Sequence, residues 1–236
     1  MEIIDANTCF GFYPYRDVAS SVENLLSNME IWKISRALAV SMKGIFYDYI
    51  EGNAETLAVC KNNKSLIPVA TIDPRKTCDF EGEIQKCMES GFKVMRLFPE
   101  YQAWNTAEVP FRKLLKVINR HQIPLIINES PSKLYDFTEE TTVPIVFLNS
   151  HYYRLYETLA VFEDRSNFYA EARHLISPDA VEVFVERIGA DRLVFGSNNP
   201  LEYTGSAICR INEAEISEQD KASIFGSNIK RIMQLD

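Results

Sequence analysis

Short apolar runs recur at fairly even spacing along this chain, and each is followed by a segment with the periodicity of an amphipathic helix. This alternation is typical of βαβ units around a parallel sheet. Several runs are unbroken stretches of Val, Ile, Leu and Phe, as expected for strands buried on both faces. The eight runs are Glu2–Ala6, Ala37–Ser41, Leu66–Ile72, Lys93–Leu97, Pro124–Ile127, Ile145–Leu148, Asn167–Glu171 and Leu193–Gly196. Eight such runs favour a closed barrel over an open sheet.

Length and composition agree with one barrel. A chain of 236 residues that is 46% hydrophobic can bury one large core, and its length lies in the range of a single (β/α)8 TIM barrel. No repeat or flexible linker divides the sequence, so we predict one α/β domain over residues 1–236. The net charge of −8 argues against nucleic-acid binding, which needs clustered Lys and Arg.

The termini and cysteines indicate a cytoplasmic protein. Met1 leads at once into an apolar strand, without the basic and apolar regions of an export signal, and no stretch approaches the length of a membrane span. The five cysteines are scattered and lack C-x-x-C spacing, so we expect reduced thiols and no membrane association.

Two helices carry boundary signals. Ser177 and Pro178 predict a helix that begins with serine as N-cap and proline at the first helical position, and Gly189 predicts its end. Ser217 and Asp220 resemble a capping box that opens a last helix on the barrel exterior.

Functional residues are expected at the carboxyl ends of the strands, because all these ends of a parallel barrel lie on one face. Two segments there, 3–11 and 192–200, resemble the opening D-x-H-x-H-x-G and the closing R-L-x-F-G-S-D-x-P of the amidohydrolase superfamily, in its amidohydrolase-related branch, or family 2. Asn7 and Cys9 stand at the two histidine positions, and Asn198 stands at the aspartate position.

The fifth and sixth strands show the same substitution. They end in Asn128 and Asn149, where the family has histidines. The resemblance implies a hydrolase or decarboxylase of small cyclic or carboxylated molecules that uses a divalent metal such as zinc. Zinc sites take about three ligands from His, Cys and carboxylate groups, and a neutral amide is a weak ligand. We therefore predict a degenerate site without a metal cofactor, which leaves open whether the protein is an enzyme.

The four asparagines are expected to converge on one pocket. With Arg96 at the end of the fourth strand, they could bind a small polar or anionic molecule. Alternatively, the amides form a network among themselves and Arg96 forms an internal ion pair with Asp5, Glu129 or Glu171. Both alternatives place Arg96 inside the barrel. The predicted ligand-binding residues are Asn7, Cys9, Tyr13, Arg96, Asn128, Asn149, His174 and Asn198.

Three further possibilities remain open from sequence. Metal-free catalysis would use an acid or base from the candidates Asp5, Glu129, His151 and Glu171. A relocated metal would use Cys9, His151 or His174. Covalent catalysis by Cys9 would instead need His151 or His174 as the base that activates the thiol. A noncatalytic barrel would bind a small molecule or a protein, and a homodimer is possible. Aromatic loops at 10–16 and 151–156 are predicted to cover the pocket.

Overall fold

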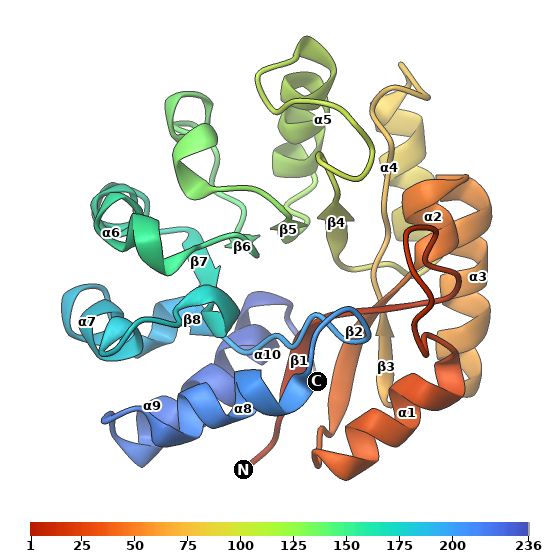
Figure 1. Cartoon of the computed structure of the whole chain (residues 1–236). Coiled ribbons are helices and arrows are strands. Elements are labelled where there is room, and N and C mark those ends of the chain that lie inside the picture. Colours follow the sequence, from red (N-terminus) through yellow and green to blue (C-terminus); the bar gives the residue numbers. More distant parts are fainter. Residues whose placement is uncertain (236) are drawn as a thin grey trace.

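The computed structural model describes residues 1–235 and forms a ring of eight parallel strands surrounded by helices (Figure 1). The strands are β1 (Ile4–Phe10), β2 (Arg36–Ser41), β3 (Leu66–Pro68), β4 (Met95–Leu97), β5 (Leu125–Ile127), β6 (Ile145–Phe147), β7 (Phe168–Glu171) and β8 (Leu193–Val194). The helices are α1 (Val22–Ile31), α2 (Met42–Phe46), α3 (Tyr49–Asn62), α4 (Phe80–Glu89), α5 (Val109–Arg120), α6 (Leu155–Asp164), α7 (Ala180–Arg187), α8 (Thr204–Glu213), α9 (Glu218–Ala222) and α10 (Asn228–Ile232). The predicted barrel is confirmed.

Two seams close the ring. Strands β1 to β3 form one parallel sheet and β4 to β8 form another. At the first seam, Ala70 N–H donates to Val94 O at 3.0 Å and Arg96 N–H donates to Ala70 O at 2.8 Å. At the second seam, Ala6 N–H donates to Phe195 O at 3.0 Å. The first pair of bonds joins the chain after β3 to β4, and the last bond joins β1 to the end of β8, so neither sheet keeps a free edge there.

Strand alternation divides the apolar residues into an inner and an outer core. In β5, Ile126 packs inside the barrel, whereas Leu125 and Ile127 pack against the surrounding helices. Successive side chains point to opposite faces of a strand, so residues two positions beyond an inner residue also face inward. The polar residues of the site occupy such positions at the carboxyl end.

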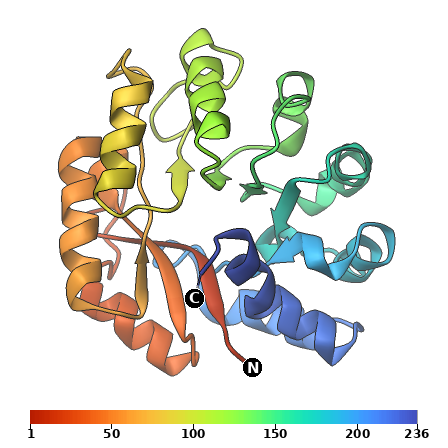
Figure 2. The same ribbon diagram turned by 180° about the vertical axis from the view of Figure 1, so that it is seen from behind.

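The last helical segment plugs the opposite end of the barrel (Figure 2). Ile229 and Ile232 of α10 belong to the inner core, next to Ile4 of β1. The expected exterior position of this helix is therefore wrong, because its apolar side fills the barrel floor. A π-helical turn, η6 (Ser223–Ser227), separates α9 from α10.

Some boundaries differ from the prediction. β1 extends to Phe10, which places Asn7 and Cys9 within the strand, with a register shift between Asp5 and Thr8. The N-cap of α7 is Asp179 in a left-handed conformation, φ 60°, so the predicted serine cap is wrong.

The N-cap of α9 is Ser217, as predicted, and its Oγ accepts a hydrogen bond from Asp220 N–H at 3.1 Å. Within residues 1–235 no helix has the length and apolar character required to span a membrane.

Candidate functional site at the barrel mouth

Arg96 lies inside the barrel mouth and is 2% exposed, which confirms its predicted inward position. Its Nε donates a hydrogen bond to Oδ1 of Asn128 at 3.1 Å, and its Nη1 lies 3.7 Å from the sulfur of Cys9. The guanidinium carbon lies 4.6 Å from the centre of the Phe98 ring. No carboxylate of residues 1–235 forms an ion pair with Arg96, so the alternative of an internal ion pair with Asp5, Glu129 or Glu171 is wrong.

The direct contacts of Arg96 are therefore all with uncharged groups, and the Glu171 carboxylate acts on it only through space. Burial lowers the pKa of Arg96, but an arginine starts from so high a pKa that the group stays protonated. Burial also raises the pKa of the Cys9 thiol, although Arg96 opposes this shift. Nucleophilic cysteines need a depressed pKa, so Cys9 is suited to contact the guanidinium as a neutral thiol.

An aromatic cap, formed by Tyr13, Phe46 and Tyr101, packs beside Phe98 at the mouth. The ring centre of Tyr13 lies 5.6 Å from that of Phe46 and 6.4 Å from that of Tyr101. Tyr101 in turn lies 6.5 Å from Phe98, whose ring contacts Arg96. The segments that follow β1, β2 and β4 thus each contribute one ring, that of Phe46 coming from the end of α2. The sequence identified only Tyr13 of this cluster.

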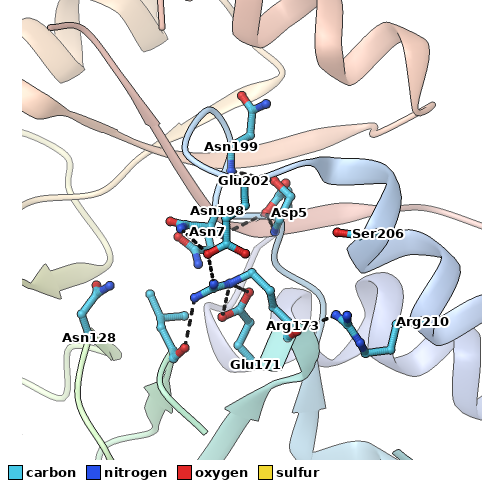
Figure 3. A network of polar contacts seen from close by, with 12 residues as sticks. Asp5, Asn7, Asn128, Glu171, Arg173, Asn198, Asn199, Glu202, Ser206 and Arg210 are labelled. Atoms are coloured by element: carbon cyan, nitrogen blue, oxygen red, sulfur yellow. Dashed lines mark hydrogen bonds and ion pairs between the residues drawn. The ribbon is translucent and has the colours of Figure 1, made fainter. Parts of the chain in front are cut away.

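A second buried arginine, Arg173, lies beside Glu171 at the mouth (Figure 3). Its Nε lies 3.2 Å from Oε1 of Glu171, and its Nη1 forms an ion pair with Glu202. Glu171 is fully buried, and burial raises its pKa to about 7, with Arg173 opposing the shift. Arg210 donates to the backbone carbonyl of Arg173 and anchors the loop after β7.

Asp5 and Asn7 carry buried polar atoms with unused hydrogen-bonding capacity. Oδ1 of Asp5 accepts from the backbone N–H groups of Asn7 and Ser197, each at 3.0 Å. Neither Oδ2 of Asp5 nor either amide atom of Asn7 has a hydrogen-bond partner of good geometry within residues 1–235. Burial raises the pKa of Asp5 to about 6.

Gly196 provides the space for this cluster. A Cβ at this position would lie 2.6 Å from Oε1 of Glu171 and 2.8 Å from Cβ of Asn7. Any larger residue would displace one of these two side chains. The glycine of the closing segment is thus explained by the close approach of β1 and β7 to β8.

The two candidate histidines lie together. The ring centres of His151 and His174 are 3.9 Å apart. Burial, followed by the charge of Arg173, lowers the pKa of both rings, and that of His174 falls to about 3. Both imidazoles are therefore neutral near pH 7. Neither ring contacts Cys9 through any interaction among the described residues.

The remaining candidates have different partners. Glu129 pairs with Lys133 at 3.0 Å instead of with Arg96. Asn198, at φ 57°, donates from Nδ2 to Glu202 at 3.0 Å. Asn128 lies apart from Asn7 and Asn198 in Figure 3. The alternative of one network of asparagine amides is wrong, because no two of the four amides are hydrogen-bonded to each other within residues 1–235. Asn149 is half-buried at the same rim.

Sequence reasoning missed several residues of the mouth. Arg173 and Glu202 were not selected, although Arg173 lies two residues beyond Glu171 and so continues the inward series of β7. Strand alternation carried one step past the predicted strand end would have found it. Phe46 and Tyr101 had no such signal, because their packing depends on how the end of α2 and the loop after β4 come together.

Comparison with known proteins identifies relatives of this structure. The family model described as amidohydrolase matches residues 49–235. No curated protein matches the sequence.

Solved structures match over the whole chain. The 5-carboxyvanillate decarboxylase from Sphingomonas paucimobilis has a TM-score of 0.81 at 13% identity, with 100% of this chain and 99% of that chain covered. The 2,6-dihydroxybenzoate decarboxylase from Rhizobium has a TM-score of 0.72 at 16% identity, with the same coverage. A 5-carboxyvanillate decarboxylase from Novosphingobium aromaticivorans, with bound manganese, has a TM-score of 0.78 at 15% identity, covering 99% of this chain and 97% of that chain. At these identities the likeness shows the fold.

The residues at the mouth do not fit the divalent metal that the resemblance implies. No three His, Cys, Asp or Glu side chains of residues 1–235 are grouped so that they could hold a metal ion. The ligand positions carry amides or a thiol whose pKa is raised, and the guanidinium of Arg96 contacts two of them, Cys9 and Asn128. A cation at this point repels a second cation.

Proposed function

Since this chain belongs to the amidohydrolase family, we propose that it is a metal-independent member, one domain over residues 1–236, that binds a small carboxylated ring compound at the barrel mouth. The solved relatives include decarboxylases named for the aromatic carboxylates 5-carboxyvanillate and 2,6-dihydroxybenzoate. These names indicate the class of ligand, a ring compound that carries a carboxylate.

The observation that carries the proposal is the state of Arg96. This guanidinium is buried, charged and without a carboxylate partner among residues 1–235. Its Nε and Nη1 are engaged by Asn128 and Cys9, while Nη2 has no hydrogen-bond partner in the described chain and is not sealed from solvent. A carboxylate bound to Nη1 and Nη2 would supply the missing negative charge in two-point geometry.

The walls of the mouth suit a planar ring. Tyr101, half-buried and packed on the buried Phe98 ring beside Arg96, offers aromatic surface, and aromatic rings stack in offset or edge-to-face arrangements. The half-buried amides of Asn128, Asn149 and Asn198 offer neutral donors and acceptors around the rim. A small ring with one carboxylate and further polar substituents matches this lining.

Titration calorimetry with benzoate, and with its neutral analogue benzamide, tests the proposal. We expect benzoate to bind the native protein, benzamide to bind at least about tenfold more weakly, and R96M to lose the preference. R112M is the matched control, because Arg112 also lies over a ring, 5.4 Å from Phe137, but is exposed. Equal binding of benzoate by R96M would contradict the proposal.

Glu171 supports a second candidate function, proton transfer to or from the bound ring. A buried carboxyl group with a pKa raised to about 7 can exchange protons near neutral pH. NMR in D2O would detect deuterium entering the ring of 2,6-dihydroxybenzoate in the presence of the protein. E171Q should bind this ligand and lose the exchange. Exchange at the rate of buffer alone would restrict the function to binding.

A further inference from the structure

The guanidinium group of Arg96 contacts two residues at former metal-ligand positions of the mouth. Cys9 belongs to β1 and Asn128 follows β5, and these residues stand where the family resemblance puts two histidine ligands. The guanidinium of Arg96 contacts both, with Nη1 at 3.7 Å from the Cys9 sulfur and Nε at 3.1 Å from Asn128 Oδ1. The side chain thus lies between two strand ends that are not adjacent to each other in the sheet order.

We propose that the guanidinium group of Arg96 replaces the divalent metal ion of the family as the fixed positive charge of the barrel mouth. This inference goes beyond the proposed function, because it concerns the charge of the site whichever ligand binds. The residues at the former ligand positions contact the guanidinium in place of a metal, and Arg96 supplies the positive charge.

The partners of Arg96 suit a guanidinium better than a metal. Asn128 presents an amide oxygen, which accepts an N–H hydrogen bond, whereas a neutral histidine would offer one ring nitrogen for a metal. The Cys9 sulfur lies 3.7 Å from Nη1 of the guanidinium and so contacts the arginine directly. The Phe98 ring, 4.6 Å from the guanidinium carbon, adds a cation–π contact.

The carboxylates of the mouth are also arranged without a metal. Glu171 and Glu202 pair with Arg173, and the Asp5 carboxyl accepts two backbone N–H groups. A zinc ion bound to Cys9 would lie about 2.3 Å from the sulfur, and so only a few ångströms from the Arg96 Nη1 atom. The charge of Arg96 would repel it at short range inside a buried site.

The test restores the family's ligands with and without the arginine. One variant carries five substitutions: N7H, C9H, N128H, N149H and N198D. A second variant adds R96M. Each protein, and the native chain, is equilibrated with zinc and then with manganese, passed through a desalting column, checked by circular dichroism, and analysed for metal per chain.

We expect the native chain to retain far less than one zinc per chain. In competition with a zinc chelator of known affinity, we expect the variant with R96M to bind zinc at least about tenfold more tightly than the variant with the five ligand substitutions alone. Equal affinity of the two variants would overturn the proposal. If the variants do not fold, the native chain still decides: near-stoichiometric zinc that C9A removes would overturn the proposal, and far less than one zinc per chain, or zinc that C9A leaves in place, would support it. A failure of benzoate to bind would count against the proposed function alone, since metal content is measured separately.

Discussion

The two buried arginines of the mouth have opposite surroundings. Arg173, 6% exposed, pairs with Glu171 and Glu202. Arg96, 2% exposed, contacts a thiol, an amide and a phenyl ring. Burial pushes the pKa of both downward, but the two carboxylates outweigh it at Arg173, whose pKa is raised, while that of Arg96 is lowered.

The difference separates a structural charge from a functional one. A buried ion pair is satisfied within the protein, and removing one partner leaves the other uncompensated. A buried charge with only neutral partners costs folding free energy that an anionic ligand can recover on binding. Arg173 is therefore expected to stabilise the fold, and Arg96 to bind a ligand.

The largest expected effect is on the Arg173 side. R173M would leave Glu171 buried without its partner, and we expect it to lower the free energy of unfolding by about 3–5 kcal/mol. Urea denaturation measures the loss. R187M is the matched control, because Arg187 and Glu163 are 57% and 47% exposed, so the loss should be within about 1 kcal/mol. Equal effects of the two substitutions would remove the structural role of Arg173.

Asp5 tests whether either arginine serves as its partner. Burial raises its pKa from 3.8 to about 6, so the native state binds the proton more tightly than the unfolded state. Stability due to this group is then fully present below about pH 3.8 and is lost as the pH rises towards 6. At about 1.4 kcal/mol per pKa unit, the loss is about 3 kcal/mol.

D5N should remove this part of the pH dependence, because an amide does not titrate in this range. The measurement is the free energy of unfolding of both proteins from about pH 3.5 to about pH 7, a range that spans the two pKa values of Asp5. A native protein that instead gains stability from Asp5 as the pH rises would mean that Arg96 pairs with Asp5. The contrast between the two arginines would then fail.

The third expected effect is a smaller change in the free energy of unfolding, and it is a gain instead of a loss. R96M replaces a buried charge without a carboxylate partner by an apolar side chain of similar length, and we expect unfolding to become harder by about 1–2 kcal/mol. Denaturation in urea without added carboxylate measures it. A loss of stability as large as that of R173M would show that Arg96 is structural.

The barrel was predictable because its signal is repeated. Each apolar run is short, but eight of them in alternation with helical segments leave few other topologies. The exact strand ends were less predictable: β1 continues to Phe10 because a register shift after Asp5 lets Thr8 to Phe10 pair with β2. The cap of α7 was wrong because the left-handed backbone of Asp179 is set by the preceding loop.

The site was only partly predictable. Arg96, Asp5 and Glu171 were found from their place at strand ends, and all three are buried at the mouth. Which carboxylate pairs with which cation depends on side-chain directions that the sequence does not encode locally. Arg173 takes Glu171, and Lys133, four residues after Glu129, takes Glu129. Arg96 was thereby left with neutral partners.

The smallest expected effect concerns the ion pair between Lys133 and Glu129. Lys133 is 56% exposed and lies 3.0 Å from Oε1 of Glu129. K133M should change the free energy of unfolding by less than about 1 kcal/mol, because a partly solvated pair gains little over its hydrated charges. It should also leave benzoate binding unchanged, because Glu129 has a backbone partner in Ser130 N–H at 2.8 Å and need not turn towards Arg96. Weaker benzoate binding by K133M would mean that the freed Glu129 carboxylate neutralises Arg96, and the mouth would then have two states selected by one surface lysine.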